Sequence, residues 1–425
     1  MNNTNQHSAY IDILHEELMP AMGCTEPIAI AYAAAMAKKV LDEMPERIVI
    51  EASDNIIKNV KSVVVPNTGN LKGIEAAAVA GIIAGDADKV LEVISVVNDD
   101  ERASIKEYLS SKDISVKASQ SGLIFDITIH AYCGDSSVTV QISHFHTNIT
   151  RIVKNNEVLR MNSDCDEVNM STKTDRSLMT VHGIIDFAES VDLAKVKEAL
   201  QQQIDFNYTI ATEGIKNSWG ANVGSVLLNT WGNDIKNRAR AFAAAGSDAR
   251  MSGCELPVMI VSGSGNQGLT ASVPVIEYAK ELKVDDDKLY RALLISNLVT
   301  IHQKTGIGRL SAYCGAISAG VGAGAGIAWL NGGGYKEIAH TIVNALAIVS
   351  GIVCDGAKPS CAGKIASAVE AGILGYEMYK NGQQFYGGDG IVVKGVENTI
   401  KNIGRLGKIG MRETDQEIIK MMLEN

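Results

Sequence analysis

The order of hydrophobic and polar residues divides this chain into three stretches of different character. In the first, YIDILHEELMPAMG and the alanine-rich EPIAIAYAAAMAKKVLDEM carry apolar side chains at helical spacing. Pro27 stands near the start of the second segment, where a helix tolerates proline. We therefore predict helix over most of residues 1–42, with GCT as the turn between two helices.

After Pro45 the pattern becomes that of β-strands. Six segments are rich in β-branched residues and partly alternate, and two helices are predicted between them, at about 73–84 and 100–111. The strand segments are RIVIEAS, VKSVVVP, ISVKAS, LIFDITIHAY, SVTVQISHF and NITRIVKNNEVL. We predict an α+β domain over residues 45–172 with a mixed or antiparallel sheet.

From residue 173 onward the strand pattern gives way to helices. Segments such as EIAHTIVNALAIVSGIVC and AGKIASAVEAGILGYEMYKNG are apolar on most sides, which suits the centre of a large helical domain. The predicted fold class is α+β, with a large, mostly helical domain over 173–425. The N-terminal helices of residues 1–44 are expected to pack on this helical domain, so that the α+β domain is an insertion.

Composition and charge narrow the class of protein. Of the 425 residues, 46% are hydrophobic and 21% charged, as in folded globular proteins. The net charge of −10 argues against a nucleic-acid partner. The uncharged stretch at residues 312–330 consists mostly of glycine and alanine, so it predicts a tightly packed buried helix and not a membrane span. With no signal-peptide pattern at the N-terminus, we expect a cytoplasmic protein without a membrane partner.

Two glycine-containing loops carry polar groups that suit a ligand. SGSGNQG has the G-x-G-x-x-G spacing of a dinucleotide-binding loop, but no βαβ pattern follows it, which argues against NAD. Its glycines allow a ligand to approach the backbone closely. PNTGN, at residues 66–70, is a second loop of this kind. An ordinary polar turn is the alternative explanation for both loops.

The chain has seven cysteines and no secretion signal, which argues against a disulfide framework. Cys133, Cys165 and Cys254 lack metal-ligand spacing, and we interpret them as ordinary residues. The other four lie at glycine-marked turns between apolar segments, where a helix N-terminus stabilises a thiolate. These four are Cys24, Cys314, Cys354 and Cys361.

Cys354 and Cys361 lie in the segment SGIVCDGAKPSCAG. Gly356 and Pro359 are incompatible with one continuous helix, so Cys354 is predicted to end one helix and Cys361 to begin the next. The pair is too far apart for a C-x-x-C redox motif, and a zinc ribbon needs two close pairs. Together with Cys314, three thiolates from turns suit a [4Fe–4S] cluster with one open iron. Spacing alone leaves simple burial of the cysteines as the alternative.

Four motifs, in this order, resemble the iron–sulfur-dependent L-cysteine desulfidase family. They are MGCTEPIA, NVKSVVVPNTG, SGSGNQG, and Cys314 followed by GIVCDGAKPSCAGK. The similarity extends over essentially the whole chain, and the helical half is also similar to the catalytic domain of iron–sulfur L-serine dehydratases. The turn that leads to Cys361 is shorter than in those dehydratases, and Pro359 stands two residues before the cysteine.

The resemblance implies a carbon–sulfur lyase that needs no PLP. Its reaction is the α,β-elimination of L-cysteine to pyruvate, ammonia and sulfide. By the same resemblance Cys314, Cys354 and Cys361 hold a [4Fe–4S] cluster, whose open iron binds the substrate thiolate as a Lewis acid. A homodimer is expected.

The resemblance also directs attention to the residues that remove the Cα proton and bind the substrate. Cys24 is the first candidate base, as a thiolate at a helix N-terminus, and its alternative role is a fourth iron ligand. Glu26 is the second candidate base, with helix capping as the alternative. The candidate substrate-binding residues, each equally explained as an ordinary surface group, are Thr25, Asn59, Lys61, Asn67, Thr68, Ser262, Ser264, Asn266 and Gln267.

Two other functions compete with this hypothesis. An L-serine dehydratase or related lyase would use the same cluster on a hydroxyl leaving group. A protein that is not an enzyme would use its cysteines to bind zinc or to pack.

Overall fold

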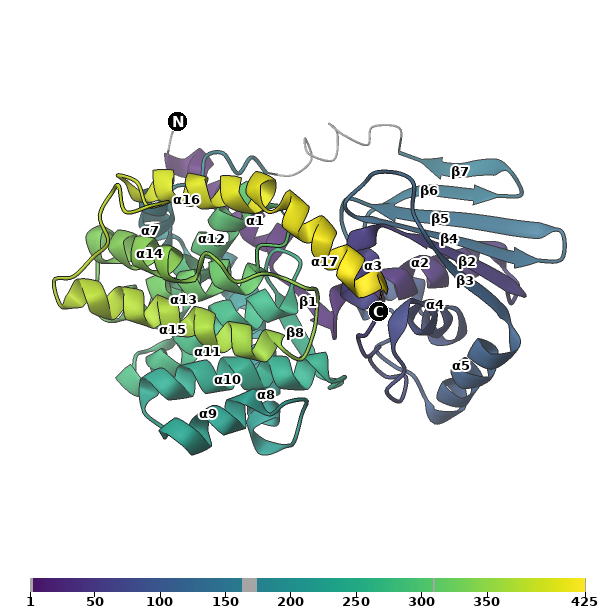
Figure 1. The fold of residues 1–425 in the computed structure, drawn as a ribbon, viewed down its shortest axis with the longest axis horizontal. Coiled ribbons are helices and arrows are strands. Elements are labelled where there is room, and N and C mark those ends of the chain that lie inside the picture. Colours follow the sequence, from purple (N-terminus) through teal and green to yellow (C-terminus); the bar gives the residue numbers. More distant parts are fainter. Residues whose placement is uncertain (1–2, 163–173, 309, 425) are drawn as a thin grey trace.

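The computed structural model describes residues 3–162, 174–308 and 310–424; Cys165 lies outside these ranges. Two lobes stand side by side in Figure 1. We call the part that contains the large sheet, residues 25–162, the sheet lobe. The part formed by residues 3–22 and 174–410 is the helical lobe. The C-terminal helix α17 (Arg412–Glu424) runs from the helical lobe to α3 of the sheet lobe.

The sheet lobe is built on a six-stranded sheet of order β3-β2-β4-β5-β6-β7. β2 and β3 are parallel and every other pair is antiparallel, so the expected mixed sheet is confirmed. The α+β class, dominated by helices, is confirmed with it. The strands are β2 (Arg47–Ala52), β3 (Asp113–Ala118), β4 (Asp126–Cys133), β5 (Ser136–Ser143), β6 (Ile149–Lys154) and β7 (Glu157–Met161).

Helix α2 (Thr25–Leu41) packs against β4, β5 and α4 (Gly73–Ala84), and not on the helical lobe as we expected for the N-terminal helices. Its alanines are buried on nearly all sides, so the sequence of the helix does not tell which partner covers it. A side chain at Gly81 would collide with the Ala31 carbonyl, which shows how closely α2 and α4 approach. The remaining helices of this lobe are α3 (Asp54–Val60), η1 (Ala87–Glu92) and α5 (Asp99–Ser111).

VKSVVVP was predicted as a strand, but it forms the end of α3 and a loop with a single bridge between Val64 and Lys72. The valines of this segment are largely buried, so their β-branched character reflects packing and not strand pairing. Conversely, two short strands were missed. β1 (Met19–Met22) interrupts the predicted N-terminal helix and pairs antiparallel with β8 (Pro257–Ile260).

The helical lobe surrounds α13, which contacts α11, α12, α14 and α15. α13 is the glycine- and alanine-rich stretch, and it is almost wholly buried, as predicted. A Cβ at Gly320 would collide with the backbone of Ala368, so the absence of side chains allows this packing. The elements of the lobe after β1 are α7 (Val181–Ser190), η2 (Leu193–Lys195), α8 (Lys197–Lys216), α9 (Val223–Trp231), α10 (Ile235–Met251), β8, α11 (Gly265–Leu282), α12 (Asp286–Ile307), α13 (Gly315–Leu330), α14 (Tyr335–Val349), α15 (Cys361–Lys380), α16 (Val396–Arg405) and η3 (Leu406–Gly410).

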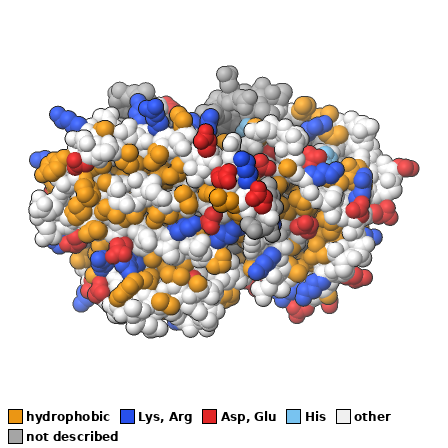
Figure 2. All heavy atoms as spheres, viewed as in Figure 1, with side chains coloured by type: hydrophobic (Ala, Val, Ile, Leu, Met, Phe, Trp, Pro, Cys, Tyr) orange, Lys and Arg blue, Asp and Glu red, His pale blue; other side chains and the backbone are white. Residues whose placement is uncertain are grey.

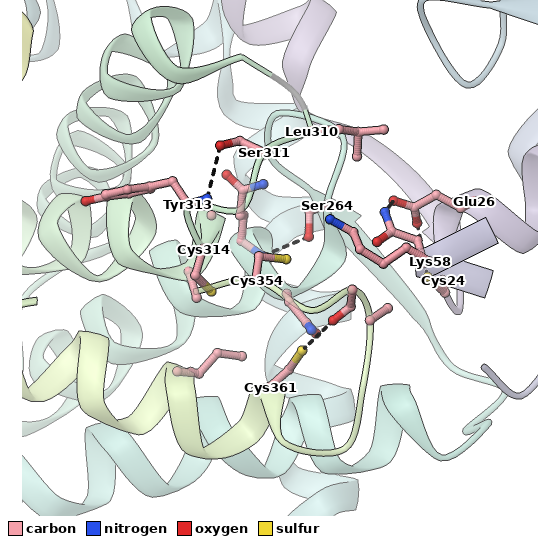
Figure 3. A pocket seen from close by; sticks show the side chains of 18 of the residues that line it. Cys24, Glu26, Lys58, Ser264, Leu310, Ser311, Tyr313, Cys314, Cys354 and Cys361 are labelled. Carbon is pink, nitrogen blue, oxygen red and sulfur yellow. Dashed lines mark hydrogen bonds between the residues drawn. The ribbon is translucent and has the colours of Figure 1, made fainter. Parts of the chain in front are cut away.

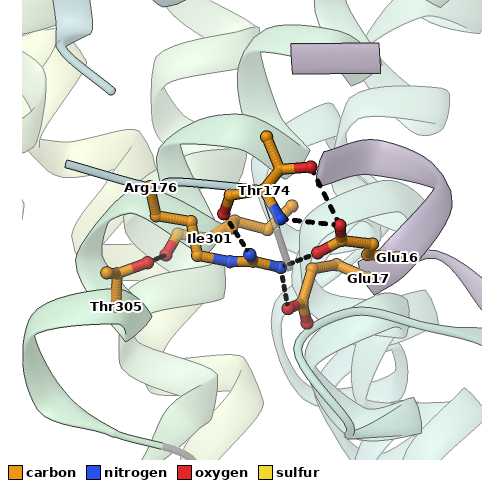
Figure 4. A network of polar contacts seen from close by, with 6 residues as sticks. All are labelled: Glu16, Glu17, Thr174, Arg176, Ile301 and Thr305. Carbon is orange, nitrogen blue, oxygen red and sulfur yellow. Dashed lines mark hydrogen bonds and ion pairs between the residues drawn. The ribbon is translucent and has the colours of Figure 1, made fainter. Parts of the chain in front are cut away.

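A polar network anchors the chain where it enters the helical lobe from the sheet lobe (Figure 4). The Arg176 guanidinium donates to Glu16 at 2.6 Å and to Glu17 at 2.7 Å. Both the backbone N–H and the hydroxyl of Thr174 donate to Glu16 at 2.9 Å. These contacts hold residues 174–176 against the end of α1 (Asn3–Glu17).

The face shown in Figure 2 carries charges of both signs over both lobes, with apolar side chains between them. Among the residues described, none of the helices combines the length and the apolar character that crossing a bilayer requires.

Candidate active site

A cavity of about 100 Å³ lies where the two lobes meet (Figure 3). The sheet lobe contributes the start of α2 and the end of α3. The helical lobe contributes α10, the start of α11, and the turns that carry the cysteines. Nine of the residues predicted from sequence line it: Cys24, Glu26, Asn59, Ser264, Asn266, Gln267, Cys314, Cys354 and Cys361.

Cys314 and Cys354 are held side by side by backbone hydrogen bonds. The Cys354 N–H donates to the Ala312 carbonyl at 2.6 Å, and the Cys314 N–H donates to the Ile352 carbonyl at 3.3 Å. Cys314 is the N-cap of α13. Cys354 lies in a loop beyond the end of α14, and not at a helix end as predicted, because the chain leaves the helix at Val349 to form these contacts.

Cys361 is the first residue of α15, as predicted. The loop before it turns at Gly356, whose φ of 91° favours glycine. A Cβ at Gly356 would lie 2.8 Å from the Lys58 carbonyl oxygen and 2.9 Å from Asn59 Oδ1. The cysteine loop therefore rests directly on α3 of the sheet lobe. The sulfur atoms of Cys314, Cys354 and Cys361 point into one space in Figure 3.

The three cysteines are close enough for the charge of one thiolate to affect the pKa of another. Burial, together with the charges that Cys354 and Cys361 would carry, raises the pKa of Cys314 to about 12. Burial also raises the pKa of Cys361, against the effect of the Lys358 N–H, which donates to its sulfur. A bound metal must therefore displace protons from Cys314 and Cys361.

The donor set fits an iron–sulfur cluster. Three sulfur donors, one buried and two partly buried, line one cavity, and thiolates are the usual ligands of such clusters. Among the described residues, no three His, Cys, Asp or Glu side chains are close enough to hold a single metal ion. Cluster cysteines bind different iron atoms, so they are spaced more widely than the ligands of one ion.

Cys24 is the N-cap of α2, where the sequence placed it, but its charge differs from our expectation. Burial first, and the Glu26 carboxylate second, raise the pKa of Cys24 well above its ordinary value, and Arg250 only partly opposes them. The thiol donates to Glu26 Oε2 at 3.1 Å. Cys24 is therefore a protonated thiol at neutral pH, because burial and a neighbouring negative charge outweigh the helix N-terminus.

Glu26 is a buried but ionised carboxylate. Burial alone would raise the pKa of Glu26. The opposing effects of His146, Cys24 and Arg250 are together larger, so this pKa lies below its usual value. Asn59 Nδ2 donates to Glu26 Oε1 at 2.9 Å, in addition to the thiol of Cys24. Because Glu26 is ionised and Cys24 holds its proton, Glu26 is the better proton acceptor of the two.

Five residues predicted to bind substrate do not line the cavity. The Thr25 hydroxyl donates to the Gly263 carbonyl at 3.0 Å and so ties α2 to the loop before α11. Ser262 is buried in that loop with a φ of 49°. The other three donate to backbone carbonyls outside the cavity: Lys61 to Met422, Asn67 to Ile94 and Thr68 to Val65.

Sequence reasoning missed the cations of the cavity, which are Lys58, Arg250 and Lys304. Lys58 forms an ion pair of 2.5 Å with Asp415 of α17, and its side chain is only 2% exposed. Arg250 stands out as a charge near the end of the alanine-rich segment ARAFAAAGSDARM, a signal that could have indicated a buried functional residue. Nothing in the sequence pairs Lys58 with a residue so far along the chain.

Comparisons with known proteins cover both lobes. The family model described as serine dehydratase alpha chain matches residues 88–420. A UPF0597 protein of Desulfitobacterium hafniense is 65% identical over 417 residues, spanning 98% of this chain and 97% of the relative. UPF0597 proteins of Lachnoclostridium phytofermentans and Treponema denticola are 53% and 45% identical, over 97% and 99% of this chain and 99% of each relative. The family match includes Cys314, Cys354 and Cys361, whereas Cys24 and Glu26 precede it.

Proposed function

This chain belongs to the serine dehydratase alpha chain family, and we propose that it is an iron–sulfur lyase that eliminates sulfide from L-cysteine. The relationship expected from the sequence motifs is confirmed at the level of this family. The choice of cysteine as substrate, the [4Fe–4S] type of the cluster and the absence of PLP are our proposals. So are a cytoplasmic location and a homodimer.

One observation carries the proposal. Three thiols of the helical lobe, one buried and two partly buried, line the same cavity as an ionised carboxylate of the sheet lobe. The thiols of Cys314, Cys354 and Cys361 would hold the cluster, and the carboxylate of Glu26 would accept a proton. An elimination needs both a base for the Cα proton and a group that stabilises the leaving atom.

The overall reaction consumes one water: L-cysteine and water yield pyruvate, ammonia and hydrogen sulfide. The Cα proton moves to Glu26, the Cα electron pair forms the double bond, and the Cβ–S bond breaks. The resulting aminoacrylate tautomerises and is hydrolysed. When bound, the cluster supplies a Lewis acid for the departing sulfur.

The chain's own residues prepare Glu26 for this step. Asn59 and Cys24 donate to separate oxygens of the carboxylate, which fixes its orientation and keeps it ionised inside the protein. Cys24 packs beside Met251, with Cys361 against the same small cluster, so the thiol lies between the carboxylate and the proposed ligands. We therefore assign proton transfer to Glu26, with Cys24 as its hydrogen-bond partner.

The test is anaerobic reconstitution of the full-length protein with iron and sulfide, followed by incubation with L-cysteine or L-serine. We expect sulfide and pyruvate in equal amounts from L-cysteine, with a higher kcat/KM than for L-serine. Pyruvate formed more efficiently from serine would contradict the proposed substrate.

The second candidate function is an L-serine dehydratase, and the printed description of the matching family favours it. The same assay decides between the two substrates. A preparation that binds zinc but neither iron nor acid-labile sulfide would instead support the structural role of the cysteines.

A further inference from the structure

Arg250 is a buried cation that forms no direct ion pair among the described residues, and the charge of Glu26 acts on it only from a distance. It is 4% exposed and lines the cavity. Its Nη1 donates to Asn266 Oδ1 at 3.1 Å, while its buried Nε has no hydrogen-bond partner within the described protein. A buried charged donor without an acceptor is costly, so the unpaired Nε favours an anionic acceptor beside this guanidinium.

The position of Arg250 adds a second feature that favours an anion. A Cβ at Gly265 would lie 2.4 Å from Arg250 Nε, so the guanidinium crosses the first residue of α11. Asn266 and Gln267, the next two residues of α11, also line the cavity. The free N–H groups and the dipole at a helix N-terminus attract carboxylates. An arginine fork beside such a helix end matches the geometry of a carboxylate group.

Two acceptors in the same cavity are also unpaired. Asn59 must turn its amino group to Glu26, because a carboxylate only accepts, and this leaves Asn59 Oδ1 free. Gln267 Oε1 is buried and has no partner within the described residues. The Gln267 amide packs so closely on Gly315, the residue after Cys314, that a Cβ at Gly315 would collide with it. These acceptors, with the charge of Glu26 nearby, suit an ammonium group.

We propose that the cavity recognises a free α-amino acid as a zwitterion, through a subsite that rests on the proposed lyase function. The α-carboxylate binds the Arg250 guanidinium and the N-terminus of α11. The α-ammonium binds Asn59 Oδ1 and Gln267 Oε1. This subsite selects free amino acids over their amides, esters and decarboxylated amines, whichever leaving group the β-carbon carries.

The experiment measures binding and not turnover. Anaerobic isothermal titration calorimetry on the cluster-loaded, full-length protein uses L-alanine, which has both charged groups and no leaving group. L-Alaninamide serves as the probe without a carboxylate. We expect L-alanine to bind at least ten times more tightly, since a hydrogen bond to a charged group contributes about 1.5–3 kcal/mol.

Variants show whether Arg250 is the carboxylate partner. Arg250→Gln should weaken L-alanine binding about 10- to 100-fold and change L-alaninamide binding less than about threefold, as in a double-mutant cycle. Gly265→Ala should have the same selective effect, because it displaces the guanidinium without removing its charge. Arg151→Gln, at an exposed position in the sheet lobe, is the control and should change neither affinity.

Three outcomes overturn the proposal. The wild-type protein binds L-alanine and L-alaninamide equally, or Arg250→Gln weakens both ligands equally. In the third, Arg250→Gln lowers the iron content and leaves the ratio of the two affinities unchanged, so that the guanidinium serves the anionic cluster. Iron content and sulfide release are read separately, so a failure of this subsite is distinguishable from a failure of the proposed lyase function.

Discussion

The two lobes each bury a carboxylate, and the pKa values of these two carboxylates shift in opposite directions. On the sheet-lobe wall, cationic neighbours and hydrogen bonds keep Glu26 ionised despite burial. In the helical lobe, Asp248 of α10 is buried outside the cavity, and desolvation raises its pKa to about 6, with only the Gly224 and Val223 N–H groups opposing it. Burial thus leaves the pKa of one carboxyl group lowered and that of the other raised, depending on which groups surround each carboxylate.

The two walls of the cavity also have different proposed roles, metal binding on one and proton transfer on the other. The helical wall supplies the three thiols that suit a cluster, and the sheet wall supplies Glu26 and Cys24. If the roles are separate, changes on one wall should affect metal content and changes on the other should affect only proton transfer. The predictions below test this division, from the largest expected effect to the smallest.

Removing a thiol from the helical wall should have the largest effect. Cys314→Ala, Cys354→Ala and Cys361→Ala should each reduce bound iron and acid-labile sulfide to near zero, because each deletes one proposed cluster ligand. The measurement is iron and sulfide per chain after anaerobic reconstitution. Cys133→Ala in the sheet lobe is the control and should retain the wild-type content. Iron retained at the wild-type level in all three variants would refute the assignment of the ligands.

Neutralising the base on the sheet wall should abolish most activity and spare the metal. Glu26→Gln should lower kcat by about 10²- to 10⁴-fold, the usual contribution of a general base, with iron content unchanged. Cys24→Ala should lower kcat less, because it removes a hydrogen bond to Glu26 and not the base itself. A larger loss from Cys24→Ala would assign proton transfer to the thiol, and a loss of iron from it would make Cys24 a ligand.

The two lobes are joined by the ion pair between Lys58 and Asp415, whose side chains are 2% and 15% exposed. Asp415→Asn leaves a buried ammonium without its anion, so it should lower the free energy of unfolding by about 3 kcal/mol. Urea unfolding followed by circular dichroism measures this change. Glu413→Gln, exposed on the same helix, is the control and should differ from wild type by less than about 0.5 kcal/mol.

The two buried carboxylates should respond to pH with opposite signs. The raised pKa of Asp248 means that its contribution to stability is present at low pH and is lost as pH rises through about 6. Asp248→Asn should therefore stabilise the protein at pH 8, by an amount on the order of 1–3 kcal/mol, and much less at about pH 4. Glu26 has a lowered pKa, so its contribution is present above the usual pKa of a glutamate and is lost only as pH falls.

Glu26→Gln should accordingly destabilise the protein at pH 8. Thermal unfolding of wild type and both variants at the two pH values measures the signs. If both substitutions shift Tm at pH 8 in the same direction, the electrostatic contrast between Glu26 and Asp248 is wrong.

Local sequence pattern predicted the elements whose periodicity comes from the chain itself. The helices at 73–84 and 100–111 appear as α4 and α5, and the Gly/Ala stretch appears as the buried helix α13. Pattern failed where pairing is distant: β1 and β8 are four residues each and lie far apart in the chain. Such short strands form because a partner completes their hydrogen bonds, which no local signal encodes.

The candidate site shows the same limit. Motif spacing and resemblance pointed to Cys314, Cys354 and Cys361 as candidate ligands, and the structure places all three in the lining of one cavity. Arg250 and Lys58 escaped notice because their significance lies in burial and in the partners they have or lack. Lys61 and Thr68 were named for their chemistry, but the fold turns their side chains to backbone carbonyls elsewhere.

The sequence by itself determined the helical and strand-rich halves, the cysteine motif and the family, because each depends on residue type and spacing along the chain. The tertiary structure decided that α2 leaves the helical lobe for the sheet, which places Cys24 and Glu26 opposite the cysteines. It also decided the charge of each group, so that Cys24 is protonated and Glu26 is ionised. Protonation depends on burial and on charges brought together from distant segments, and these exist only in the folded chain.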